Sequence, residues 1–113
     1  MALLATQAIP ANGLAAPTFS AANASDTFVA GPDILLYCKN TNAATRTITL
    51  TTPGTSSGLG VADATNTIGA TTGELVFGGF QSQIYNDPTT GVCTITPSAS
   101  AGVSYAVLQV IAN

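Results

Sequence analysis

The sequence predicts an all-β protein, a small antiparallel β-sandwich or barrel of about seven or eight strands with an extended N-terminal arm. Short apolar or alternating segments recur at intervals of roughly ten residues, and Gly, Pro, Asn and Asp cluster between them. No segment has the apolar repeat of an amphipathic helix. A chain of 113 residues forms one domain, which we place at residues 26–113, after an arm at residues 1–25.

Residues 1–25 form the predicted arm because they are rich in Ala, Asn and Pro and sustain neither a helical nor a strand period. The segment nevertheless carries large apolar side chains, which a free tail would leave in water. We therefore expect the arm to lie on its own domain or on a neighbouring molecule. The start of the chain lacks the basic residues of a signal peptide, which predicts folding in a reducing cytosol.

The first half of the domain contains the clearest strands. Asp26–Val29 precedes a turn at Gly31–Asp33. Ile34–Lys39 is a short apolar run, which favours a strand buried on both faces. Thr45–Thr51 alternates strictly, with Ile and Leu on one face and Thr on the other. This pattern predicts a half-buried strand that ends at a loop, Pro53–Gly58.

The second half continues the pattern with strands that are mostly shorter. The predicted strands are Leu59–Val61, Thr67–Ile68, Glu74–Phe77, Val92–Thr96 and Val103–Ile111. Ala64–Asn66 is expected to connect the first two. Phe80–Tyr85 is expected to form a short turn that packs its aromatic rings inward.

The inward-facing positions of these strands form the predicted core: Phe28, Leu36, Cys38, Ile48, Leu50, Val61, Ile68, Leu75, Phe77, Cys93, Ile95, Tyr105 and Val107. The last strand is apolar on both faces, so one face can line the core while the other needs a partner, either the arm or another subunit. The candidate interface residues are therefore the large apolar residues of the arm and the outward face of the last strand: Leu3, Leu4, Ile9, Leu14, Phe19, Ala106, Leu108 and Val110.

Charged side chains are rare, at 6% of the chain, whereas a typical soluble domain has about 25%. Two basic residues cannot neutralise several phosphates, so we expect no nucleic-acid partner. No apolar run is long enough for a membrane-spanning helix, so we expect no membrane partner either. The surface must consist largely of Thr, Ser, Asn, Gly and Ala, which indicates contact with copies of the chain or with a larger assembly.

The chain lacks the groups of an active site. It has no His, and its five carboxylates are scattered, with Asp33 and Asp87 beside prolines in turns. Cys38 and Cys93 have no CxxC spacing and no His to complete a metal site. We expect buried free thiols, with a disulfide between neighbouring strands as the alternative. The sequence therefore predicts no enzyme activity, no catalytic or metal site, no cofactor and no small-molecule substrate.

The order of motifs along the chain resembles that of a known family. The arm segment at 13–22 is followed by Asp26-Thr27-Phe28, Leu35–Asn40, Arg46–Thr51, Gly58–Asp63 and Tyr85-Asn86-Asp87. This order is similar to that of small proteins from tailed-phage head modules, the capsid decoration (cement) proteins. The resemblance extends from about residue 13 onward. The chain departs from the family pattern at the turn 69–73, where a Pro-Ala-Gly-Gly type is usual, and by Cys at two positions where Val is usual.

The resemblance implies a structural virion protein on the outer surface of a bacteriophage capsid. Its implied partner is the major capsid protein, and a homo-oligomer, such as a trimer at capsid three-fold positions, is one arrangement that such proteins use. Two other functions stay open. One is a glycan-binding β-sandwich on a virion or cell surface, which would use Tyr37, Gln83, Tyr85 and Asn86. The other is a head–tail or tail component.

Overall fold

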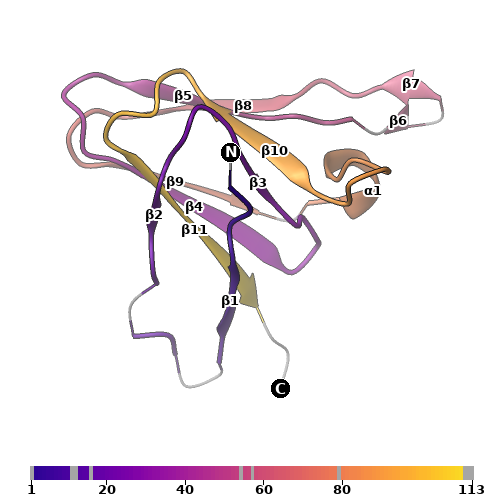
Figure 1. Ribbon diagram of the computed structural model, residues 1–113, viewed down its shortest axis with the longest axis horizontal. Helices are drawn as coiled ribbons and strands as arrows, with labels where there is room; N and C mark the ends of the chain where they lie inside the picture. Colours follow the sequence, from indigo (N-terminus) through magenta and orange to yellow (C-terminus); the bar gives the residue numbers. More distant parts are fainter. Residues whose placement is uncertain are drawn as a thin grey trace.

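Two β-sheets pack face to face, as expected for a small β-sandwich (Figure 1). The computed structural model describes residues 2–10, 13–15, 17–53, 55–56, 58–78 and 80–110. The first sheet, here called the β5 sheet, has the order β3-β10-β5-β8 and is antiparallel throughout. Its strands are β3 (Asp26–Phe28), β5 (Arg46–Leu50), β8 (Ala64–Ile68) and β10 (Cys93–Pro97).

The second sheet, here called the β4 sheet, has the order β1-β11-β4-β9, and β2 also pairs with β11. Its strands are β1 (Thr6–Ile9), β2 (Ser20–Ala21), β4 (Ile34–Asn40), β9 (Gly73–Gly78) and β11 (Val103–Val110). The pairing of β1 with β11 is parallel, whereas the other pairings are antiparallel. A small β6–β7 ladder (Thr55–Ser56 and Leu59–Gly60) and a short helix α1 (Ser82–Tyr85) lie outside both sheets. Within the described residues, no helix has the length and apolar character needed to cross a membrane.

The core lies between the sheets and follows the strand alternation. Ile48 and Leu50 of β5 and Cys93 and Ile95 of β10 are fully buried, as are the inward residues of β3, β4 and β11. Most of the predicted core is confirmed, and Leu75 and Phe77 pack against it while partly exposed. Val61 is the exception. It is only half-buried and outside the core cluster, because it follows the β6–β7 ladder and lies beyond the sheet.

Several element boundaries differ from the predictions. The segment at 64–66 was expected to be a connection, but it forms the first part of β8. Its Thr side chains lie next to those of β5, with hydroxyl oxygens 3.3 Å apart for Thr49 and Thr65. The expected loop at 53–58 contains β6. Strand β4 alternates between buried and half-buried positions, so it is not buried on both faces. Ile111, the expected end of the last strand, lies outside the described residues.

Candidate docking surface along the N-terminal arm

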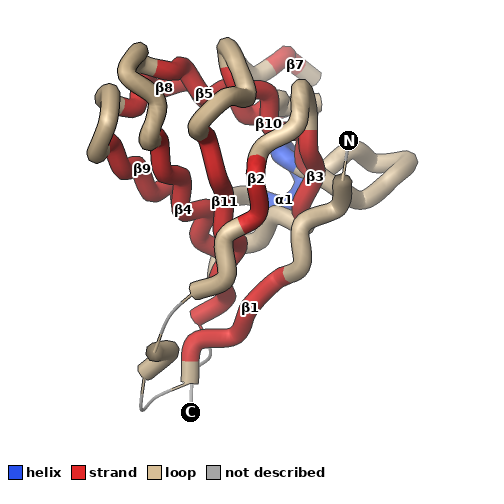
Figure 2. The backbone as a smooth tube through the Cα atoms, turned by 60° about the vertical axis from the view of Figure 1, so that its left-hand side comes forward, coloured by secondary structure: helices blue, strands red, loops and turns tan. Residues whose placement is uncertain are grey.

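The N-terminal arm crosses from one sheet to the other. Leu4 donates its backbone N–H to the Thr27 carbonyl at 2.8 Å, and Thr27 donates to the carbonyl of Ala2 at 2.8 Å. These bonds attach the first residues to β3, and β1, which begins two residues after Leu4, runs parallel to β11 (Figure 2). The arm therefore occupies the outer edges of β3 and β11, which lie on the same side of the sandwich.

Asp26 anchors the beginning of the arm. Its carboxylate accepts hydrogen bonds from the Ala2 N–H at 3.0 Å and from both the backbone N–H and the side-chain amide of Asn23, at 2.9 and 2.8 Å. The side chain is fully buried, and burial alone would raise its pKa. The hydrogen bonds outweigh this effect and lower the pKa of Asp26 below its usual value. In the sequence, the only indication of this anchor is that an acidic residue, Asp26, stands at the first position of the strand that follows the arm.

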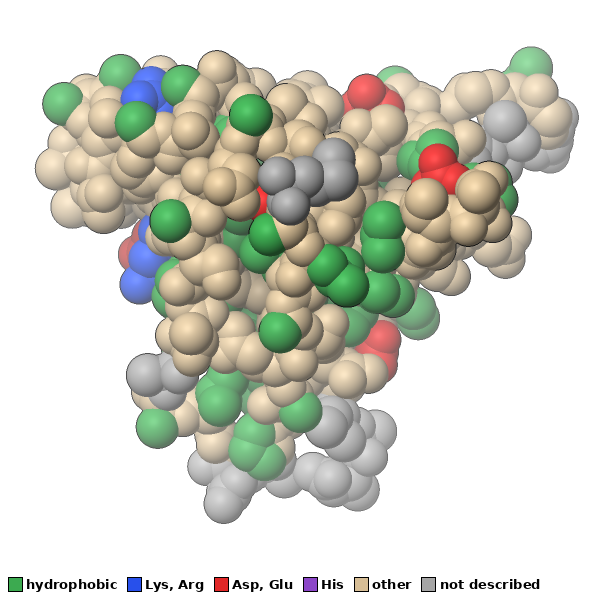
Figure 3. Space-filling view, in the orientation of Figure 1, with side chains coloured by type: hydrophobic (Ala, Val, Ile, Leu, Met, Phe, Trp, Pro, Cys, Tyr) green, Lys and Arg blue, Asp and Glu red, His purple; other side chains and the backbone are tan. Residues whose placement is uncertain are grey.

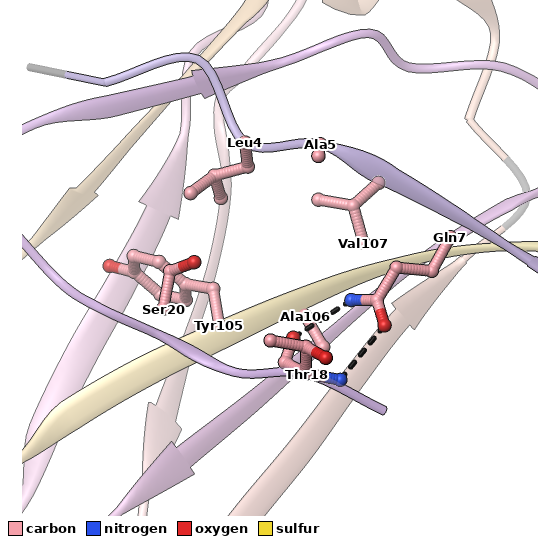
Figure 4. A pocket seen from close by; sticks show the side chains of 8 residues that line it. All are labelled: Leu4, Ala5, Gln7, Thr18, Ser20, Tyr105, Ala106 and Val107. Carbon is pink, nitrogen blue, oxygen red and sulfur yellow. Dashed lines mark hydrogen bonds between the residues drawn. The ribbon is translucent and has the colours of Figure 1, made fainter. Parts of the chain in front are cut away.

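The arm leaves a cavity of about 260 Å³ between β1 and β2. Both strands pair with β11, and they separate where the chain loops outward (Figure 1). The cavity is lined by Leu4, Ala5, Gln7, Thr18, Ser20, Tyr105, Ala106 and Val107. The Gln7 amide spans the opening, since its Nε2 donates to the Thr18 carbonyl and its Oε1 accepts from the Thr18 N–H, both at 2.8 Å (Figure 4). None of the described lining residues is Asp, Glu, Lys, Arg or His.

The chain itself covers part of the predicted interface. Leu4, Ala106 and Leu108 are buried, with exposed fractions of 8%, 2% and 7%. These three residues are thus corrected from partner-facing to internal positions, because the chain buries them without a second molecule. Ile9, Leu14 and Phe19 are half-buried. Leu3 and Val110 remain exposed, at 64% and 51%. They flank the arm, because Leu3 bridges to β3 and Val110 lies opposite Ile9 at the end of β1.

Phe19 reaches the outer face of the β4 sheet. Its ring makes an edge-on contact with Tyr37, at 5.2 Å between centroids, and the Lys39 Nζ lies 4.5 Å from its centroid. The Tyr37 hydroxyl donates to Glu74, and this hydrogen bond raises the pKa of Tyr37. The sequence did not predict this group, because its members are far apart along the chain. The contact with Lys39 secures the returning half of the arm by a cation–π interaction.

The structure separates Tyr37 from the other residues considered for glycan binding, Gln83, Tyr85 and Asn86, which lie at α1. Tyr37 lies on the outer face of the β4 sheet, whereas Tyr85 packs against Phe80 and the core. The side-chain amide of Asn86 accepts from the Ala30 N–H and donates to the Ala30 carbonyl, both at 2.9 Å. These polar groups are therefore already engaged within the chain.

Both cysteines are buried free thiols, so the expectation of burial is confirmed. Burial raises the pKa of Cys38 to about 12, and burial together with the charge of Asp63 raises that of Cys93 to about 12. Neither is therefore a nucleophile near neutral pH.

The two carboxylates expected in turns both accept hydrogen bonds. Asp87 accepts from the backbone N–H groups of Thr89 and Thr90, as expected for a turn, whereas Asp33 accepts from the side chain of Gln109. Across the described part of the chain, no three His, Cys, Asp or Glu side chains are grouped to hold a metal ion.

Most of the visible surface is uncharged. Figure 3 shows small acidic and basic areas on a face that is otherwise polar or apolar. Among the described residues, five large apolar side chains are exposed: Leu3, Val29, Leu59, Val76 and Val110. A scan of known protein families finds no model that matches this chain, and searches of curated proteins and of solved structures find no match either.

Proposed function

We propose that this chain is a non-enzymatic structural protein of a phage particle, a decoration protein that binds the outer surface of the capsid. The observation that carries the proposal is that Leu3 and Val110, which lie toward opposite ends of the segment 3–9, are both more than half exposed in a chain with 6% charged residues. Free monomers usually remain soluble through surface charge, so such a surface is suited to permanent contact. The resemblance to decoration proteins favours the major capsid protein as the partner.

Binding of this kind needs buried area rather than reactive groups. Apolar burial contributes roughly 25 cal/mol per Å² before the costs of association are subtracted. In a shell, the same modest contact repeats at many symmetric positions, for example as trimers at three-fold axes. The sum resists the outward pressure of packaged DNA although each contact is weak.

Deleting the whole arm is a poor test, because residues 2–9 also complete the hydrogen bonding of β3 and β11. A cleaner variant combines Leu3→Asp with Val110→Asp, which places charge on the proposed contact and leaves the core intact. The matched control is Leu59→Asp, at a leucine that is 72% exposed on β7. We expect the double variant to lose co-sedimentation with capsids of the encoding phage that lack this protein, and the control to keep it.

Imaging distinguishes the capsid from other virion locations. Antibody against the chain should label the heads of purified particles in electron micrographs. Labelling confined to the tail or to the head–tail junction would contradict the proposal and favour a tail component. Particles that carry no label, together with wild-type protein that does not sediment with capsids, would exclude a virion role.

A further inference from the structure

The two sides of the sandwich differ in how their strand edges are covered. On one side, the arm pairs with β3 and β11. On the other side, β8 and β9 are the last strands of their sheets, and no strand of the described chain pairs with their outer edges (Figure 2). An uncovered edge presents a row of free N–H and C=O groups and is a template for another strand.

The alternation of hydrogen bonds along β4 identifies which backbone groups of β9 point to the free edge of the sheet. Val110 donates its N–H to the Asp33 carbonyl, and these residues continue by one position the β4–β11 register, in which Gln109 is opposite Ile34. In an antiparallel ladder, alternate residues direct both backbone groups to the same neighbour. Since Asp33 bonds to β11, the odd-numbered residues direct their backbone groups to β11 and the even-numbered residues of β4 direct theirs to β9. Leu36, for example, bonds to Phe77, which lies opposite it. It follows that Glu74, Val76 and Gly78 direct their N–H and C=O groups outward, to the free edge.

The edge of β9 is complementary to itself. A two-fold axis through Val76, perpendicular to the sheet, places Val76 opposite Val76 of a second copy and Glu74 opposite Gly78 of that copy. All of these residues offer outward backbone groups, so each opposed pair exchanges two hydrogen bonds. The single acidic residue faces a glycine and not its own equivalent, so the pairing brings no like charges directly together.

The strand also lacks the usual protection of an edge. It is six residues long, contains neither Lys nor Pro, and pairs with β4 without a bulge. Val76, at its centre, is 55% exposed. The same two-fold axis places the β5 sheets of both copies on one side of the joined sheet, so that their β8 edges face each other. Strand β8 contains only Ala, Thr, Asn and Ile. Strand β8 therefore brings no charged side chain to the place where the second sheets meet.

We propose that β9 is a self-association edge, at which two copies of this chain pair antiparallel about Val76 to form one continuous β-sheet. The occupant is a second copy because the register, the outward hydrogen-bonding groups and the placement of Glu74 all fit the strand to itself. This interface is separate from the arm surface proposed to contact the capsid.

Two substitutions at Val76 test the pairing without disturbing the core. Val76→Pro removes an outward N–H that makes no bond to β4, and Val76→Lys places two like charges opposite each other at the axis. Val29→Lys is the matched control, at a valine that is 48% exposed beyond the end of β3. Analytical ultracentrifugation of the full chain should give about half the wild-type mass for both Val76 variants and the wild-type mass for the control. Circular dichroism should show the same strand content for all proteins.

A cross-linking variant gives a second readout. Residues in a hydrogen-bonded antiparallel pair have Cα atoms about 5.5 Å apart, a separation that a disulfide spans. Val76→Cys should therefore form a covalent dimer on mild oxidation, while Val29→Cys should not. Equal mass for the wild type and both Val76 variants, or a Val76→Cys protein that stays monomeric on oxidation, would overturn the proposal. Neither result bears on capsid binding, which the co-sedimentation experiment measures separately.

Discussion

The side chain of Gln7 pairs with the backbone of Thr18 as another strand would. Its amide donates to the carbonyl and accepts from the N–H of the same residue, both at 2.8 Å. The two residues face each other across the opening between β1 and β2, and among the described residues no strand pairing joins these two halves of the arm. One side chain thus closes the arm into a loop.

Replacing Gln7 with Glu should loosen this loop. The carboxylate still accepts from the Thr18 N–H, but it cannot donate to the Thr18 carbonyl and repels it. We expect faster hydrogen exchange at the β1 amides and a loss of about 1 kcal/mol in the free energy of unfolding. The control is Gln83→Glu, at an exposed glutamine of α1 with no side-chain hydrogen bond among the described residues. Equal exchange in both variants would show that this contact does not hold β1.

Asp26 should make the stability of the protein depend on acid. Its pKa is lowered in the folded state, so its contribution is complete above the unfolded pKa of about 3.9 and is lost as pH falls through the folded pKa. We expect Asp26→Asn to lower the free energy of unfolding by about 2–3 kcal/mol at pH 7. The loss should shrink below about pH 4. Urea unfolding at several pH values measures it, with the exposed Asp33→Asn as the control. A loss independent of pH would contradict a charged Asp26.

Tyr105 should tolerate the removal of its hydroxyl. The side chain is 1% exposed, and its oxygen has no hydrogen-bond partner within the described part of the chain. Because a buried unpaired hydroxyl is unfavourable, Tyr105→Phe should leave the free energy of unfolding unchanged or raise it by about 1 kcal/mol. Tyr105→Leu, which changes the shape of the ring site, should instead destabilise the protein by roughly 1–3 kcal/mol. Thermal unfolding compares the three proteins, and a destabilised Phe variant would indicate a bound water at the hydroxyl.

The two cysteines should react only after unfolding. Burial raises the pKa of Cys38 and Cys93 to about 12, so neither forms a thiolate at pH 8, and neither is accessible to a reagent. We expect no colour with a thiol reagent until urea is added. The Val29→Cys variant is the positive control and should react at once, since that position is exposed.

The raised pKa of the two cysteines also predicts how the free energy of unfolding depends on alkali. Their contribution is complete below about pH 9 and is lost as pH rises toward 12.

The sequence predicts the core better than it predicts the pairing of strands. Ile48, Leu50 and Ile95 were assigned correctly because side-chain alternation is a local property of an extended backbone. The partner of β11 was not predictable, because parallel pairing with β1 depends on backbone groups that every residue carries. For the same reason, an apolar Leu108 indicated that something covers it, but not whether that was the arm or another molecule.

The sequence could name the apolar residues of the candidate interface, but it could not tell which of them the folded chain leaves exposed. Leu3 and Val110 stay on the surface, as an interface requires, while Leu4, one position further along, points into the core. The alternation that separates these neighbours accompanies the hydrogen bonds that join residues 2 and 4 to Thr27 of β3. A segment rich in Ala and Pro shows no such period in its sequence.

The parallel pairing of β1 with β11 has a mechanical consequence. Tension that pulls the start of β1 away from the end of β11 slides the two strands past each other along their length. All the hydrogen bonds of that ladder then carry the load together and must rupture together, whereas in a hairpin pulled open they would break singly. Force delivered through these two strands therefore loads their ladder in shear.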